Sequence, residues 1–416
     1  MWPFAIIIFL SAFLLFQVQP LISKFILPWF GGASSVWLVA MLFFQIILLL
    51  GYLYSYLLHR FKVRTQKIIH LVIISLTTLT LPIIPKMGGI LLDPNWPALK
   101  IIIILTLTVG LPYFVLSTTG PLLQAWYVRK NSTRNPYLLY SLSNFGSLIA
   151  LLSFPFLVEP FFDSFTQAWL WSGGFICFVL SVFILIVFKL KDLPERTINN
   201  LQREKIAISR LALWVGFPAL ASAIFLAITN HVSLDIAPIP FLWVLPFSIY
   251  LLTFIIAFAQ DRFFKKAFYL LATLCSLSVV PYIIFSRQTL TYPLVPLVCV
   301  YLLILYVSCM LAHGELYRLK PKNENLTLYY LMIALGGALG GLFVSVLAPI
   351  IFNAYWELPL LLLALLGLVS VSYFLSHEFK QQQTKKIKMI MFACFCLLIL
   401  FFCGYIIYAQ HKSTLT

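Results

Sequence analysis

Long apolar runs alternate with short polar linkers along the whole chain. Each run is about 20 residues long, which is the length that an α-helix needs to cross the hydrocarbon core of a bilayer. The runs predict transmembrane helices at 3–22, 37–58, 68–85, 99–118, 137–156, 167–188, 211–230, 241–259, 268–285, 293–312, 327–349, 357–376 and 389–409. The pattern therefore predicts an all-α polytopic membrane protein with about 12–13 transmembrane helices.

Composition excludes a soluble protein. Of the 416 residues, 62% are hydrophobic and only 10% are charged, whereas an ordinary soluble domain has roughly 25% charged residues. No metal-ligand spacing, nucleotide-binding loop, HExxH or GxSxG motif occurs. We therefore expect no catalytic residue, no metal and no cofactor, and the chain is not expected to be an enzyme.

The basic residues are distributed very unevenly among the linkers. Of the 28 Lys and Arg residues, 23 lie in the alternate linkers 60–67, 128–134, 189–210, 261–266, 318–322 and 380–388. The positive-inside rule places these linkers and the N-terminus in the cytoplasm, for a multi-pass protein of the cell (inner or plasma) membrane. The formal charge of +16 also invites a nucleic-acid hypothesis. Orientation and contact with anionic lipid explain charge spread over short loops better, so no nucleic-acid partner is expected.

The chain divides into two similar parts. The run 139–162 aligns with 329–352 at an offset near 190, which places Tyr140 on Tyr330 and Gly146 on Gly336. Two six-helix pseudo-repeats joined by an inside loop are typical of major-facilitator-type transporters. The predicted parts are an N-terminal half (1–188), a cytoplasmic linker (189–210), a C-terminal half (211–376), and a basic loop with one extra C-terminal helix (377–416).

Each half has a proline-containing polar connector after its first helix. The connectors 23–37 and 231–243 both end on a tryptophan that opens a long apolar helix. Broken backbone at membrane depth must line a cavity or lie against protein, and matching interruptions in two repeats point to a transport site.

Several segments, in order, resemble the membrane portion of the fused major-facilitator/spermidine-synthase family. They are L27-PWFGGASSVW37, F43-FQIILLLGYLYSYLL58, N144-FGSLIALLSFPFLVEPFF162, F241-LWVLPFSIYLLTF254, H313-GELYRLK320 and L326-TLYYLMIALGGALGGLFVSVLA348. The resemblance covers roughly residues 15–352. In that family a soluble aminopropyltransferase-like domain typically follows, and no such segment follows here, so spermidine synthesis is not expected. The loop 59–67 also lacks the Gly-x-x-x-Asp-Arg gating signature of the wider superfamily.

Polar residues inside or beside the predicted spans are the candidate site residues, because a charge near the bilayer centre is costly and usually faces a cavity. Asp235 and His231 suit proton coupling or cation coordination, or else belong to an exposed connector in which Asp235 caps the next segment. Glu159 is a second coupling candidate, with an interfacial carboxylate as the alternative. Lys24 could neutralise Glu159 or Asp235 across the halves. The uncharged candidates are Asn230, Asn144 and Gln19.

Two further groups of residues lie near the ends and faces of helices. His313 and Glu315 end the tenth span and are candidates for a gate, or else are solvated residues of a helix end. Gly336, Gly337, Gly340 and Gly341 form two overlapping small-xxx-small pairs on the eleventh span, which predicts close helix packing.

The sequence favours a secondary transporter of a small molecule, coupled to an ion or proton gradient. A polyamine-like cation is the candidate substrate, and only the family resemblance suggests it. The alternative is a non-catalytic membrane scaffold or accessory protein that presents a separate soluble enzyme partner.

Overall fold

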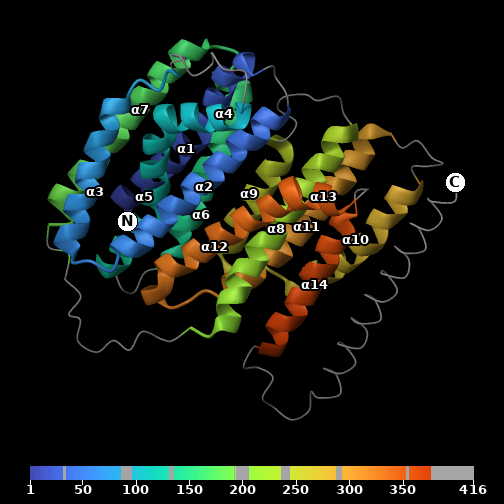
Figure 1. Ribbon diagram of the computed structural model, residues 1–416. Coiled ribbons are helices and arrows are strands. Elements are labelled where there is room, and N and C mark those ends of the chain that lie inside the picture. The colour runs from blue at the N-terminus through green and yellow to red at the C-terminus, as the bar shows by residue number, and fades with distance from the viewer. Residues whose placement is uncertain are drawn as a thin grey trace.

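A computed structural model describes residues 1–30, 34–85, 96–130, 135–191, 193, 206–235, 244–286, 293–352 and 356–375 (Figure 1). Every regular element in these ranges is helical. Within these described ranges, ten helices are long and apolar enough to cross a membrane, and Val244–Ala259 is a shorter apolar helix. The predicted all-α polytopic fold is thus confirmed. The predicted thirteenth helix, at 389–409, lies outside the described residues.

The first group of helices runs from α1 to α7. Its members are α1 (Trp2–Ile26), α2 (Ser34–Leu58), α3 (Val63–Thr77), α4 (Pro97–Leu105), α5 (Leu111–Lys130), α6 (Tyr137–Ser153) and α7 (Ser164–Ile184). A π-helical segment, η4 (Thr106–Gly110), joins α4 and α5 into one spanning helix, and η5 (Phe154–Val158) and η6 (Leu185–Lys189) extend α6 and α7. The group has its own continuous apolar core.

The second group of helices runs from α8 to α14. Its members are α8 (Ile208–Asp235), α9 (Val244–Ala259), α10 (Lys266–Ser286), α11 (Leu294–Arg318), α12 (Leu326–Leu342), α13 (Ala348–Ile351) and α14 (Glu357–Leu375). The π-helical segment η9 (Phe343–Leu347) connects α12 with α13. A second apolar core holds this group together. The two groups lie side by side in Figure 1, and α2 contacts α12 while α6 contacts α9 across their boundary.

Glycines set the closest helix contacts in both groups. A Cβ added at Gly336 would lie 2.3 Å from the Val215 carbonyl oxygen of α8. In the first group, a Cβ at Gly146 would lie 2.8 Å from the Phe9 carbonyl oxygen of α1. Small residues allow backbones to approach in a membrane, where lipid is as apolar as the side chains. The two glycines that the repeat alignment pairs therefore make equivalent contacts, α6 against α1 and α12 against α8.

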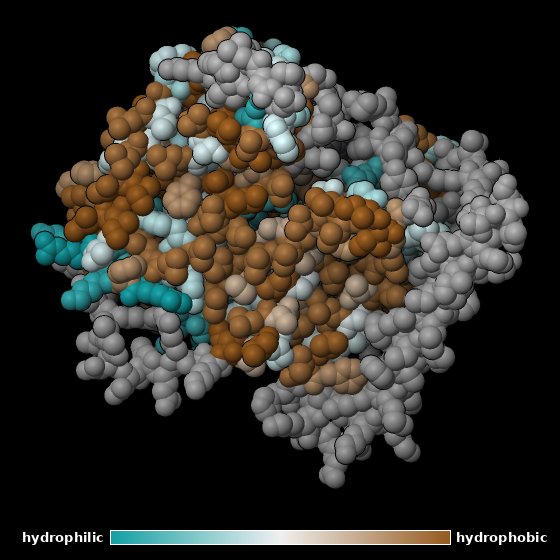
Figure 2. Space-filling view, in the orientation of Figure 1, coloured by the Kyte–Doolittle hydropathy of each residue, from teal (hydrophilic) through white to brown (hydrophobic). Residues whose placement is uncertain are grey.

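The outer surface of the bundle is apolar, as a membrane protein requires. Large side chains such as Leu180, Phe188 and Phe268 are 56%, 71% and 60% exposed. Figure 2 shows a broad hydrophobic face, with hydrophilic residues gathered mainly at one side of the molecule. Such an area would be an aggregation hazard in water but is the normal surface toward lipid. The chain is a multi-pass membrane protein.

The basic linkers between helices meet one another. Lys67 Nζ donates to the Leu190 carbonyl oxygen, and Lys130 Nζ donates to that of Lys189. In the second group, Arg210 Nη2 donates to the Leu319 carbonyl oxygen at 3.3 Å. We call the side of the bundle that carries these linkers the basic end. Its assignment to the cytoplasm remains a prediction from the positive-inside rule.

Several helix boundaries differ from the sequence prediction. The fourth span, predicted at 99–118, continues through Pro121 to Lys130. The tenth, predicted at 293–312, continues to Arg318. The third begins at Val63 rather than at residue 68. Prolines and polar residues inside these segments look like helix-ending signals in the sequence. The helices nevertheless continue, because neighbouring helices and local π segments supply hydrogen-bond partners for the backbone groups.

Candidate functional site

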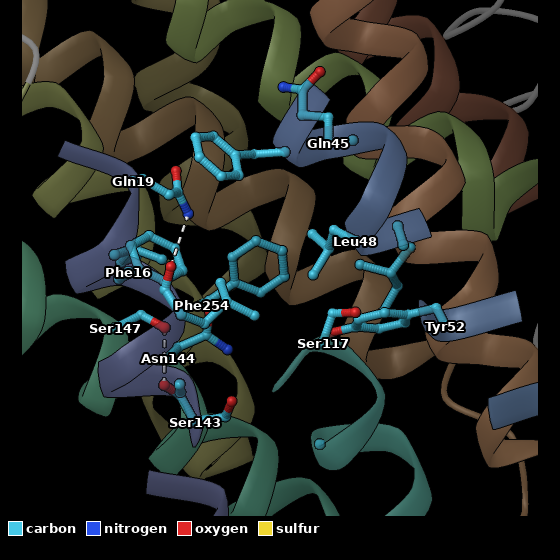
Figure 3. Close-up of a pocket in the computed structure, with 18 of the residues that line it drawn as sticks. Phe16, Gln19, Gln45, Leu48, Tyr52, Ser117, Ser143, Asn144, Ser147 and Phe254 are labelled. Carbon is cyan, nitrogen blue, oxygen red and sulfur yellow. Dashed lines mark hydrogen bonds between the residues drawn. The ribbon is translucent and has the colours of Figure 1, made fainter. Parts of the chain in front are cut away.

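A cavity of about 220 Å³ lies between the two groups of helices. Helices α1, α2, α5 and α6 of the first group and α8, α9 and α12 of the second group line it (Figure 3). Four of these helices, α1, α6, α8 and α12, correspond to the predicted first, fifth, seventh and eleventh spans. The polar lining residues are Ser11, Gln19, Gln45, Tyr52, Tyr113, Ser117, Tyr140, Ser143, Asn144, Ser147, Ser222 and Tyr250.

Two of the amide side chains in the lining, those of Gln19 and Asn144, are held by neighbouring groups. Gln19 Nε2 donates to the Tyr113 hydroxyl at 3.2 Å, a contact between α1 and α5 that Figure 3 draws as a dashed line. Asn144 Nδ2 donates to the Tyr140 carbonyl oxygen of its own helix at 2.9 Å. Fixed amides of this kind suit recognition by hydrogen bonds, because little side-chain entropy is lost when a solute binds.

Serine hydroxyls of the lining donate to backbone carbonyls and thereby present oxygen lone pairs to the cavity. Ser117 Oγ donates to the Phe114 carbonyl at 2.6 Å, and Ser147 Oγ donates to that of Ser143 at 3.2 Å. Ser222 Oγ of α8 donates to the Gly337 carbonyl of α12 at 3.0 Å. A hydroxyl that has used its proton can still accept. The wall therefore favours a solute with hydroxyl or N–H donors.

The cavity lining contains no Asp, Glu, Lys, Arg or His among the described residues. Moving an isolated charge from water into such a site costs several kcal/mol or more, unless an opposite charge compensates it. The lining supplies no such partner. The site is thus chemically suited to an uncharged, polar solute.

Aromatic rings form much of the remaining wall. Phe44 packs on Tyr113 with ring centroids 4.8 Å apart, and Phe225 stacks on Phe247 at 5.1 Å. Phe16 of α1 meets Phe247 of α9 at 5.4 Å, so the two groups also touch beside the cavity. Rings of this kind bind the apolar faces of a solute.

A layer of tyrosines connects the cavity lining with the linker after α11 at the basic end. Tyr140, a lining residue, stacks on Tyr330 of the other group with centroids 4.9 Å apart and planes 10° apart. Tyr330 donates its hydroxyl to Gln124 Oε1 at 2.6 Å, and Tyr137 donates to the Pro321 carbonyl at 2.8 Å. Both hydrogen bonds join the first group to the second. We call Tyr137, Tyr140 and Tyr330 the tyrosine layer.

Of the sequence-predicted site residues, Gln19 and Asn144 line the cavity. Glu159 and Lys24 do not. Lys24 Nζ lies 2.5 Å from Glu159 Oε1, and Gln167 Nε2 donates to Glu159 Oε2 at 3.4 Å. This ion pair joins residues of the first group, not the two halves. It fits the interfacial alternative for Glu159 better than a place in the cavity.

The segment around Asn230 differs from its prediction. Helix α8 continues through Asp235, so Asn230 and His231 are helical rather than part of a broken connector. Asn230 is exposed, whereas His231 is buried and stacks on Tyr301 at 5.2 Å. Neither lines the cavity. The sequence prediction ended this helix too early, at residue 230, where polar residues begin. A helix end at the membrane interface tolerates such residues. The side chain of Asp235 and residues 236–243 lie outside the described part of the chain.

His313 and Glu315 are not solvated residues of a helix end. Helix α11 extends beyond both, and their exposed fractions are 0% and 3%. His313 stacks on Phe254 at 3.6 Å, and its Nδ1 lies 3.0 Å from Thr253 Oγ1. Glu315 Oε1 lies 3.0 Å from Lys266 Nζ. Their role in gating remains a prediction.

The sequence reasoning missed most of the lining, above all Tyr52, Tyr113, Tyr140 and Tyr250. A signal for them existed, since each is a tyrosine inside an apolar span, and a buried hydroxyl needs a partner or a cavity. No group of three or more His, Cys, Asp or Glu side chains close enough to hold a metal occurs among the described residues.

The fold of the chain is similar to that of a solved structure. The crystal structure of a double tryptophan mutant of XylE matches with a TM-score of 0.52 and 14% sequence identity, over 92% of this chain and 97% of that chain. The chain has a major-facilitator-like fold. No family model and no curated protein matches the sequence. The resemblance to the fused major-facilitator/spermidine-synthase family thus depends on the motifs alone.

Proposed function

We propose that the chain is a membrane secondary transporter that binds a small, uncharged, polar solute in the central cavity. The observation that carries the proposal is a cavity shared between two helix groups and lined by amides, hydroxyls and aromatic rings without a charge. Its volume of about 220 Å³ is below the roughly 300–1,000 Å³ typical of sites for drug-sized ligands. The solute is therefore small, with several hydrogen-bonding groups.

A polyamine fits this cavity poorly. Spermidine-like cations need carboxylates or open aromatic faces to replace their hydration. The cavity has aromatic rings but no carboxylate among the lining residues that the structure describes. The family resemblance suggested a polyamine, and the lining favours a neutral solute instead. Ion or proton coupling through Asp235 stays a prediction, to be tested by comparing uptake by wild type and Asp235→Asn with and without an imposed proton gradient.

A thermal-stability screen of the purified protein tests the solute class. The panel contains neutral polyhydroxy compounds, amides, polyamines and organic anions of matched size. A bound ligand raises the melting temperature according to its concentration and dissociation constant. We expect neutral compounds to give the shift, and Gln19→Ala and Asn144→Ala to abolish it.

A control variant makes this outcome specific. Ser181 lies on α7 outside the cavity and donates only to the Cys177 carbonyl of its own helix. Ser181→Ala should keep the full ligand shift. A shift from spermidine that survives Gln19→Ala and Asn144→Ala would contradict the proposed site. Uptake of the hit compound into proteoliposomes then separates a transporter from a scaffold that merely binds it.

A further inference from the structure

A second pocket, of about 350 Å³, opens at the basic end of the second helix group. Its lining comes from the segment around the start of α10 and from the end of α11 and the linker after it. The lining residues are Phe264, Lys266, Gly314, Tyr317, Arg318 and Lys320. Half of these described lining residues are cations, and none of them is acidic. The proposed transport site lies elsewhere and shares no residue with this pocket.

Ion pairs and a cation–π contact position the three cations around the pocket. Glu315 is only 3% exposed, and its Oε1 lies 3.0 Å from Lys266 Nζ and 3.5 Å from Arg318 Nη1. One carboxylate thus orients two cations but balances only one unit of their charge. Lys320 Nζ lies 3.5 Å from the centroid of the Tyr317 ring. Three cations converge from three positions of the chain, and the two that share Glu315 keep a net positive charge for an added anion.

The backbone adds to this field and shapes the pocket. Helix α10 begins at Lys266, so its first N–H groups carry the partial positive charge of a helix N-terminus. Gly314 lets the Phe264 ring lie directly against α11, because a Cβ there would be 2.2 Å from the ring. The ring forms one wall, and Tyr317 lies among the cations.

We propose that this pocket binds a phosphate group, held by Lys266, Arg318 and Lys320. Guanidinium and ammonium groups are the side chains that recognise phosphate, Arg as a fork and Lys as a point charge. The group is either the headgroup of an anionic phospholipid or a water-soluble phosphate compound. The exposed apolar residues Phe268 and Leu271, on the first turns of α10, offer a surface for acyl chains beside the pocket.

The test uses the full chain in nanodiscs of phosphatidylcholine. Phosphatidylglycerol is added to the bilayer in one arm, and inorganic phosphate to the buffer in the other at constant ionic strength. Binding is measured by native mass spectrometry for the lipid and by thermal shift for both. The variant is Lys320→Gln, which leaves both partners of Glu315 in place. Arg318→Gln is a second variant, and Lys62→Gln, an exposed cation of the α2–α3 linker, is the control.

Each outcome decides the proposal. We expect wild type to bind one of the two phosphate sources. Lys320→Gln and Arg318→Gln should bind that source roughly fivefold more weakly, since each cation near an anionic surface contributes about that factor to binding. Lys62→Gln should bind as wild type does. A response to phosphatidylglycerol alone identifies a lipid headgroup, and a response to inorganic phosphate identifies a soluble compound. Equal loss in Lys62→Gln, or no binding of either source by wild type, would overturn the proposal.

Discussion

The close contact between α8 and α12 predicts that a side chain at position 340 forces the two helices apart. A Cβ added there would lie 2.1 Å from the Ala219 carbonyl oxygen and 3.0 Å from the Ala223 nitrogen. Carbon and carbonyl oxygen approach to about 3.3 Å at closest in favourable contacts. Because both opposing atoms belong to the backbone of a helix, no side chain can rotate away. Gly340→Ala must therefore push α12 from α8 by about 1 Å.

The magnitude follows from a comparison with Gly337→Ala. Alanine gains about 1 kcal/mol of helix propensity over glycine, and this gain is common to both variants. A Cβ at Gly337 meets no atom within 4 Å. The difference between the two variants is then the cost of overpacking, about 1–3 kcal/mol. At about 2–4 °C for each kcal/mol in a domain of 150–250 residues, Gly340→Ala should melt about 2–12 °C below Gly337→Ala.

Thermal unfolding of the two variants in one detergent measures this gap directly. Gly336→Ala, whose Cβ would lie 2.3 Å from the Val215 carbonyl oxygen, should behave as Gly340→Ala does. Equal melting temperatures for Gly340→Ala and Gly337→Ala would refute the argument, because they would show that the helices separate without cost.

Three further predictions concern single contacts. Tyr330→Phe leaves the buried Gln124 oxygen without its donor and should lower the free energy of unfolding by about 1–3 kcal/mol. Denaturant titration measures this change, and an unchanged midpoint would contradict a stabilising role for this hydrogen bond between the two groups. Glu159→Gln should change stability by at most ~1 kcal/mol, because its lysine partner is 40% exposed, and a larger loss in the same titration would show that the pair is more deeply shielded. The Thr166 hydroxyl, with two backbone N–H groups of α7, lowers the pKa of the exposed carboxyl of Asp163 below 3.8. The Asp163 carboxylate therefore contributes stability above that value, and this contribution is lost as the pH falls through the lowered pKa. Asp163→Asn should weaken the acid dependence of the melting temperature, and a pH profile identical to that of wild type would exclude the effect.

Hydrophobic periodicity predicted the fold well because the bilayer leaves few choices. Backbone groups in lipid must bond within their own segment, so each long apolar run becomes a helix. The repeat alignment also identified a tertiary contact. It pairs Tyr140 with Tyr330 at an offset near 190, and the two rings stack on each other across the two groups. Internal similarity thus pointed to residues that meet in space.

The candidate site was harder to predict for a physical reason. The sequence reasoning searched for charges, because a charge in the membrane is costly and therefore conspicuous. Glu159 and Lys24 instead neutralise each other, and Glu315 lies beside two cations at the basic end. The cavity uses tyrosines and serines, which are common in apolar spans for many reasons. Only the packing of seven helices distinguishes Tyr113 or Ser147 from a residue that faces lipid.

The uncharged lining of the central cavity has a consequence for energetics in a living membrane. An electrical potential of 100 mV does about 2.3 kcal/mol of work on each elementary charge that crosses. A neutral solute in a site whose described lining holds no charged side chain carries none across. Under the proposed function, and with no coupled ion, the loaded protein would turn over at the same rate in polarised and depolarised vesicles, and only the solute gradient would set the direction of flow. A turnover rate that changes with the potential would indicate that an ion bound elsewhere crosses with the solute.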